Sequence, residues 1–166
     1  ALPIWDYSIE EIDTLTGKIA GRPKSATFRT ADLVGLDVLG HVAANLHEKV
    51  ENDERRDAFQ VPELMQRLVE ADRLGEKTKA GFYKKEDGEI KSIDPKTFEY
   101  TSAEEEELGD LGSVWKAGGL SDRLRALYAD DGRAGAFFRE TTLELLAYSA
   151  RRLGEISDNP ADVDRA

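Results

Sequence analysis

The chain has 166 residues, with 23 basic and 34 acidic side chains, a formal net charge of −11 and no cysteine. Disulfide bonds, thiol nucleophiles and cysteine-ligated metals are therefore excluded. The acidic excess argues against nucleic-acid binding, because that affinity comes largely from neutralising phosphates. A chain of this length can bury a core of its own without staples or metals.

Apolar residues make up 40% of the chain and charged residues 34%, a balance typical of soluble, mostly helical proteins. No apolar run is long enough to cross a membrane, and the start of the chain lacks the basic and apolar blocks of a secretion signal. We therefore expect a cytoplasmic protein. The chain begins without Met, which suggests a fragment or a processed product.

The chain opens with a helical pattern. Ser8 and Glu11 have the spacing of a capping box, which predicts a helix over residues 8–16, with Gly17 as a left-handed stop. A loop containing Gly and Pro follows. A second helix is expected over residues 27–34, where apolar residues return at helical spacing.

Two more helices are expected before residue 80. Gly35 breaks the preceding helix, and Asp37 is placed to cap the next one. A later helix is predicted with Pro62 at its first position and Gly75 at its end. The apolar stripe of the helix that follows Asp37 consists of Val38, Leu39, Val42, Leu46 and Val50.

Residues 81–94 change the period of the pattern. An aromatic pair, an Asp-Gly turn and alternating isoleucines predict a small β-hairpin, too short to carry a core of its own. The predicted fold class is therefore all-α with one small hairpin near residues 81–94.

Residues 101–120 are acidic and rich in glycine, which predicts a solvated linker. The run Glu104–Glu107 is expected to face solvent, and one helical turn is expected around Val114–Trp115. After the linker, Ser121 is expected to cap a helix, and residues 134–156 form a long amphipathic pattern. Its apolar positions are Phe137, Phe138, Leu143, Leu146, Ala147, Ala150 and Leu153.

The last residues of the chain, 159–166, resemble residues 8–15. Both segments read as a capping residue, two variable positions, an acid, an aliphatic residue and Asp. Coincidence can explain the match, because caps and acidic first turns are common in helices. If the repeat is real, both ends of the chain cut through a repeating unit.

Three motifs together resemble a known family. They are the Ile-Asp pair at residues 12–13, the loop and helix at residues 21–37 that end in Val-Gly-Leu-Asp, and Gly-Glu-Lys-Thr-Lys-Ala-Gly-Phe-Tyr at residues 75–83. Their order and spacing resemble the helical C-terminal domain of 3-hydroxyacyl-CoA dehydrogenases. Residues 21–30 are most similar to large bacterial fatty-acid oxidation proteins in which the dehydrogenase is joined to an enoyl-CoA hydratase.

The resemblance implies an NAD-dependent oxidation of 3-hydroxyacyl-CoA to 3-oxoacyl-CoA in β-oxidation. It implies that residues 1–100 are a first helical repeat, incomplete at its N-terminus, and that residues 101–120 are a linker. Residues 121–166 would then begin a truncated second repeat. The NAD-binding Rossmann domain and the rest of the second repeat would be partners outside this chain.

No catalytic, cofactor-binding or metal-binding residue is predicted here. The resemblance places the family's His, Glu, Ser and Asn outside this sequence, so we expect the chain alone to be inactive. The sequence also lacks the Gly-x-Gly-x-x-Gly motif that cradles a dinucleotide. His41 and His47 are spaced so that they lie on different sides of a helix, which favours a structural role for both.

Four residues are candidates for binding the acyl-CoA substrate: Lys24, Ser25, Thr27 and Arg29. They lie in a segment with basic residues, hydroxyls and no acid, at the start of a helix. Such a segment suits an anionic or thioester group. The alternative is structural, with Thr27 as a cap, Phe28 in the core and the basic residues in solvent.

A second basic segment surrounds Gly81, Phe82 and Tyr83. It contains four lysines against one glutamate, Glu76. The structural interpretation is favoured here, with the aromatic pair packing onto the helices and Gly81 permitting a close approach. The lysines are Lys77, Lys79, Lys84 and Lys85.

The apolar face of residues 134–156 indicates a partner. It could form a homodimer or dock onto the first repeat. A function of a different class also stays open: a free-standing helical module that binds proteins through this face, without any acyl-CoA function.

Overall fold

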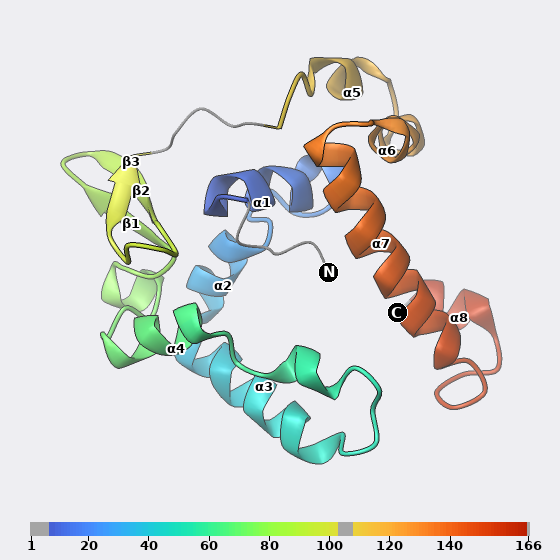
Figure 1. The fold of residues 1–166 in the computed structure, drawn as a ribbon, viewed down its shortest axis with the longest axis horizontal. Coiled ribbons are helices and arrows are strands. Elements are labelled where there is room, and N and C mark those ends of the chain that lie inside the picture. Colours follow the sequence, from blue (N-terminus) through green and yellow to red (C-terminus); the bar gives the residue numbers. More distant parts are fainter. Residues whose placement is uncertain (1–6, 103–107, 166) are drawn as a thin grey trace. The chain divides into compact units, whose positions relative to one another are not determined.

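The computed structural model describes residues 7–102 and 108–165 (Figure 1). The described residues fall into two compact units. We call residues 7–102 the N-terminal unit and residues 108–165 the C-terminal unit. The expected solvent-facing run Glu104–Glu107 lies outside the described residues.

The N-terminal unit consists of short helices and a small sheet (Figure 1). The α-helices are α1 (Ile9–Thr16), α2 (Phe28–Val34), α3 (Leu36–Lys49) and α4 (Glu63–Glu70). Single 3-10 turns are η2 (Lys18–Ala20), η3 (Arg56–Phe59) and η4 (Glu76–Thr78). The predicted helical character of this region is confirmed.

The sheet has three antiparallel strands, β1 (Tyr83–Glu86), β2 (Glu89–Ile93) and β3 (Tyr100–Ser102), in that order. The predicted hairpin is confirmed, with Asp87 and Gly88 both at positive φ in its turn. Strand β3 was not predicted, because three residues are too few to show an alternating pattern.

The core of the N-terminal unit joins the helices to the sheet. Its side chains come from α1, α3, α4 and the hairpin region, and the rings of Phe28 and Phe82 lie 4.5 Å apart. Each large apolar side chain buried in this way contributes about 1.5 to 3 kcal/mol. The buried members are Ile9, Leu36, Leu64, Met65, Leu68, Phe82 and Ile93.

The predicted capping box of α1 is confirmed. The amide of Ser8 donates to Glu11 Oε2 over 2.9 Å, and the amide of Glu11 donates to Ser8 Oγ over 3.1 Å. The expected left-handed stop at Gly17 is wrong, because its φ is −98°. The left-handed residue is Gly21, with φ 78°, which ends η2.

Two other helix ends differ from the sequence prediction. Gly35, not Asp37, is the residue before α3, and Asp37 lies in the first turn of the helix, where its carboxylate forms an ion pair with Lys77. Helix α4 starts just after Pro62 and ends at Glu70, before Gly75. The chain turns there because Asp72 adopts a positive φ of 55°.

The apolar stripe predicted on α3 is present, but most of it is not buried within the N-terminal unit. Val38, Val42 and Leu46 are 46%, 50% and 38% exposed. Leu39, another member of the stripe, packs against the core, and Leu36 at the start of the helix is buried in it. The helix therefore contacts the core through residues near its start.

In its described residues the C-terminal unit consists of helices joined by turns and loops: α5 (Gly112–Lys116), α6 (Leu120–Ala129), α7 (Arg133–Arg151) and α8 (Pro160–Arg165). The helical turn expected around Val114–Trp115 is confirmed as α5. The expected cap at Ser121 is wrong, because α6 follows Gly119 and has no side-chain cap. The long helix ends at Arg151, five residues earlier than expected.

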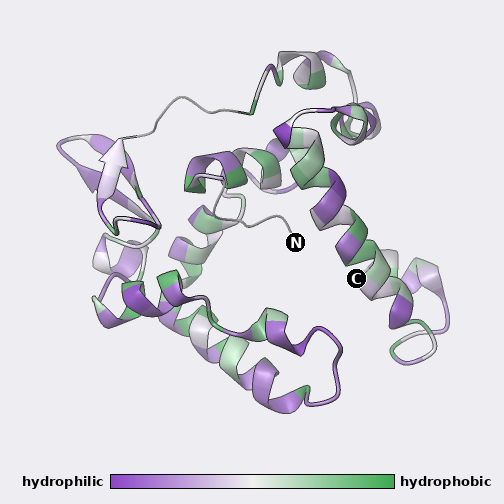
Figure 2. Cartoon of the chain, viewed as in Figure 1, coloured by the Kyte–Doolittle hydropathy of each residue, from purple (hydrophilic) through white to green (hydrophobic). Residues whose placement is uncertain are grey.

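Helix α7 carries hydrophobic and hydrophilic residues along its whole length (Figure 2). Phe137 is buried near its start, whereas Leu143, Leu145 and Leu146 are about half exposed. The expected apolar face is therefore buried only toward its N-terminal end. No helix in the described parts of the chain is both long and apolar enough for a membrane span.

Candidate functional site

A carboxylate from α1 caps the start of α2. The amides of Thr27, Phe28 and Arg29 donate to the two oxygens of Asp13 over 3.0, 2.7 and 3.0 Å. The side chain of Thr27, the local capping position, makes no cap hydrogen bond of its own. Asp13 thus satisfies three amides that a helix start leaves open and places a negative charge at the positive end of its dipole.

Tyr83 joins strand β1 to the same carboxylate. Its hydroxyl donates to Asp13 Oδ2 over 2.9 Å. Burial raises the pKa of the Tyr83 phenol, and the charge of Asp13 raises it further. The phenol therefore keeps its proton and acts as a fixed donor.

A second carboxylate, Asp32 of α2, is 1% exposed. It accepts hydrogen bonds from the amides of Phe82 and Tyr83 over 2.8 and 2.9 Å. Burial raises the pKa of Asp32, while these amides and the charge of Arg29 oppose that rise. Gly81 has to be glycine here, because a Cβ would lie 2.7 Å from Asp32 Cγ.

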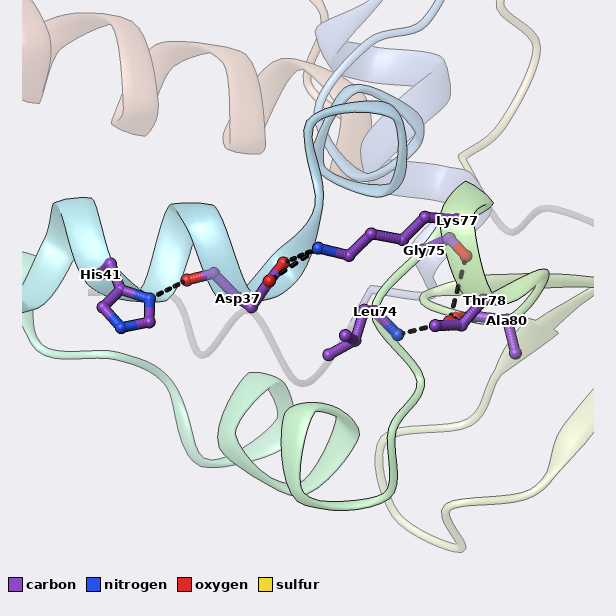
Figure 3. A network of polar contacts seen from close by, with 7 residues as sticks. All are labelled: Asp37, His41, Leu74, Gly75, Lys77, Thr78 and Ala80. Carbon is purple, nitrogen blue, oxygen red and sulfur yellow. Dashed lines mark hydrogen bonds and ion pairs between the residues drawn. The ribbon is translucent and has the colours of Figure 1, made fainter.

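A third polar cluster ties η4 to α3, and Figure 3 shows the Lys77 side chain extended toward Asp37. Lys77 Nζ lies 2.5 and 2.6 Å from the two Asp37 oxygens, and this contact lowers the pKa of Asp37. His41 Nδ1 lies 2.7 Å from the backbone oxygen of Asp37. Thr78 Oγ1 accepts from the amide of Leu74 over 2.8 Å and so holds the loop.

A pocket of about 400 Å³ is lined by residues of α2, η4 and the hairpin, and Tyr83, which contacts Asp13 and Asp32, is one of them. Tyr83, Ile90 and Gly75 provide its uncharged walls. Its charged lining residues are Arg29, Glu76, Lys79, Lys84 and Lys85.

The four predicted substrate-binding residues have different surroundings. Lys24 is exposed, and Ser25 Oγ accepts from Thr30 over 2.8 Å. Thr27 Oγ1 donates to another threonine hydroxyl within the unit, over 2.8 Å. Arg29 lines the pocket and pairs with Glu76. The capping role expected for the Thr27 side chain under the structural alternative is wrong, because Asp13 accepts the amides of the α2 start instead. A substrate role for the four residues stays a prediction.

The second basic segment divides in two. Lys77 pairs with Asp37, whereas Lys79, Lys84 and Lys85 line the pocket. Phe82 is buried as expected. No capping role was predicted for Asp13 or Asp32, because their partners lie 14 to 70 positions away and no local pattern indicates such contacts.

His41 and His47 form no hydrogen bond with each other in the described structure. His41 contacts its own helix, and the backbone oxygen of His47 accepts from Arg56 Nε over 2.8 Å. Within residues 7–102 and 108–165, no group of three His, Asp or Glu side chains could hold a metal ion.

Residues 7–102 thus form a small helical unit closed by a three-stranded sheet, with the partly buried Asp13 and the buried Asp32 joining its elements. Residues 5–85 match the family described as "3-hydroxyacyl-CoA dehydrogenase, C-terminal domain". The chain therefore belongs, through these residues, to the 3-hydroxyacyl-CoA dehydrogenase family.

Three curated relatives extend this match. A "Probable 3-hydroxyacyl-CoA dehydrogenase" of Bacillus subtilis is 41% identical over 96% of this chain and 20% of its own length. A "Putative fatty acid oxidation complex trifunctional enzyme" of Rickettsia felis is 26% identical over 88% of this chain and 19% of its own length. The mitochondrial "Hydroxyacyl-coenzyme A dehydrogenase" of Sus scrofa is 38% identical over 48% of this chain and 24% of its own length.

The chain thus spans about a fifth of the length of these relatives. No solved structure matches it significantly.

Proposed function

We propose that this chain is part of an NAD-dependent 3-hydroxyacyl-CoA dehydrogenase of fatty-acid oxidation and supplies its helical, substrate-side domain. The observation that carries the proposal is the 41% identity with the Bacillus subtilis relative over 96% of the chain. The match of residues 5–85 to the C-terminal domain family supports it. The cytoplasm is the compartment we propose.

NAD does not fit the described residues, so we propose that another domain holds it. A Rossmann site needs parallel strands and a glycine-rich turn at a helix start. The strands here are antiparallel and three to five residues long, and the sequence has no Gly-x-Gly-x-x-Gly. The catalytic acid–base groups are proposed to lie in that other domain as well.

The acyl-CoA is proposed to approach the segment that contains Lys24, Ser25, Thr27 and Arg29. Support comes from the Asp13 cap, which fixes the backbone of Thr27 and Arg29 and so presents the segment in one conformation. Lys24 is exposed and carries a charge opposite to that of the CoA phosphates. A preorganised basic segment loses less entropy on binding than a mobile one.

The proposed organisation is a first helical repeat over residues 1–100, a linker over 101–120 and the start of a second repeat over 121–166. One feature supports the repeat: α8 follows Asn159, whose Oδ1 accepts from the amide of Ala161 over 3.1 Å, much as α1 follows its capping Ser8. The half-exposed leucines of α7 are the surface we propose for a homodimer.

The activity is tested on the full-length gene product that contains this chain. Formation of NADH from 3-hydroxybutyryl-CoA is expected, and its absence with folded protein would overturn the proposal. Calorimetric titration of the 166-residue chain with acetoacetyl-CoA then tests the substrate side, with NADH as the parallel titration. Lys24→Glu is expected to weaken thioester binding at least fivefold, whereas Lys49→Glu, an exposed change at the end of α3, should leave it unchanged.

A further inference from the structure

Two of the three lysines that line the pocket beside η4 form no ion pair with any residue that the structure describes. Arg29 pairs with Glu76. Lys84 pairs with Glu86 over 2.8 Å, and Lys91 holds the other Glu86 oxygen over 2.9 Å. Together these lysines lower the pKa of Glu86 to about 2.

Within the described part of the chain, neither Lys79 nor Lys85 forms an ion pair, and Glu76, the acidic residue of the pocket lining, pairs with Arg29. The pocket therefore has an uncompensated positive charge within a chain whose net charge is −11. Two like charges lining one cavity repel each other, and an anion between them would remove that cost.

The backbone on the Lys79 side of the pocket is held rigidly. Lys79 itself has a left-handed φ of 60°. The amide of Gly75 donates to the Ala80 oxygen over 2.7 Å, and the amide of Ala80 donates back to Gly75 over 3.2 Å. Thr78 Oγ1 donates to the Ala80 oxygen over 3.0 Å. The backbone from which the Lys79 side chain extends is therefore held in place before any ligand arrives, which reduces the entropy lost on binding.

The hairpin provides the other wall. Lys85 of β1 pairs in register with Ile90 of β2, so their side chains share one face of the sheet with Tyr83. Ile90 is 63% exposed, and no side chain covers it well. The pocket thus combines cationic groups with an exposed apolar edge.

We infer that this pocket binds the diphosphate group of a phosphorylated organic ligand, with Lys79 and Lys85 as the binding cations and Ile90 in contact with the ligand's uncharged part. A volume of about 400 Å³ exceeds the need of a single phosphate. Charge-assisted hydrogen bonds to lysine suit phosphate oxygens. Coenzyme A and a free nucleotide diphosphate both present this chemistry, and only the coenzyme A source rests on the proposed function.

The first test is calorimetric titration of the 166-residue chain with inorganic pyrophosphate. Saturable binding that weakens with added salt is expected. Lys79→Asn, which keeps a residue tolerant of positive φ, and Lys85→Gln are each expected to weaken binding at least fivefold. Lys96→Gln removes an exposed lysine outside the pocket and is expected to change nothing. Circular dichroism confirms that each variant is folded.

Binding of pyrophosphate with equal affinity by the wild type and both pocket variants would overturn the inference, as would the absence of binding. The source of the diphosphate is then decided with coenzyme A, ADP and acetoacetyl-pantetheine, which lacks the diphosphate. If coenzyme A binds more tightly than ADP and Lys79→Asn weakens its binding, the ligand is the coenzyme. If coenzyme A and ADP bind with equal affinity, the pocket binds nucleotide diphosphates generally. Failure here leaves NADH formation by the full-length protein intact, so the two proposals fail independently.

Discussion

The hydroxyl of Tyr83 donates to Asp13 Oδ2 over 2.9 Å, and the amide of the same tyrosine donates to Asp32 Oδ2 over 2.9 Å. One residue of β1 thus contacts carboxylates from both α1 and α2, across 70 and 51 positions of sequence. Asp13 in turn holds the start of α2. The hairpin, α1 and α2 are therefore joined through two acidic side chains.

Asp13→Asn is expected to lower the free energy of unfolding by about 2 kcal/mol, because hydrogen bonds to a charged group contribute roughly 1.5 to 3 kcal/mol each. In the wild type, the Arg29 amide and the Tyr83 hydroxyl both donate to Asp13 Oδ2. Asparagine keeps one oxygen acceptor but places an NH2 group, itself a donor, opposite these two donors. Urea unfolding measures the change. Glu48→Gln, an exposed change on α3, is the control and should cost less than about 0.5 kcal/mol.

Tyr83→Phe is expected to cost about 1 kcal/mol in the wild type and clearly less in the Asp13→Asn background. The reason is that the hydroxyl has its acceptor only when the carboxylate is present. A double-mutant cycle from four urea curves measures the coupling. Purely additive costs would show that the hydrogen bond does not contribute to stability.

Gly81→Ala is expected to destabilise the N-terminal unit by about 3 kcal/mol. Its Cβ would lie 2.7 Å from both Asp32 Cγ and Gly75 Cα, and neither can move without disturbing the hairpin contacts. Gly40→Ala is the matched control, because its Cβ meets only Met65 Cε at 3.6 Å within a helix. That change should raise stability by about 0.5 to 1 kcal/mol. Equal effects of the two substitutions would contradict the close approach of Gly81 to Asp32.

The buried Asp32 predicts a pH dependence of stability. Its folded pKa is raised above its ordinary value of 3.8 by burial. Between these two pKa values the folded state binds more protons than the unfolded state, so this residue's contribution to the free energy of unfolding falls as the pH rises. Asp32→Asn removes the titration. The stability of the wild type minus that of Asp32→Asn is therefore expected to decrease as the pH rises above the ordinary aspartate pKa of 3.8, as measured by urea unfolding. A constant or increasing difference would contradict a raised pKa.

Local patterns in the sequence determined much of the secondary structure. The capping box of Ser8 and Glu11, the break at Gly35 and the hairpin turn at Asp87 and Gly88 depend on near neighbours, so they could be predicted. The family motifs could be recognised for the same reason, since each is a short continuous segment. Strand β3 was not predicted, because a strand of three residues is too short to show an alternating hydrophobic pattern.

The tertiary structure alone decided which charges meet. Asp13 replaces the local cap of α2, Asp37 pairs with Lys77 across 40 positions of sequence, and Lys79 and Lys85 line one pocket. Contacts between residues tens of positions apart depend on how the elements pack, and no spacing rule along the chain encodes them. The sequence by itself therefore determined the elements and the family, whereas packing determined the acidic anchors and the basic pocket.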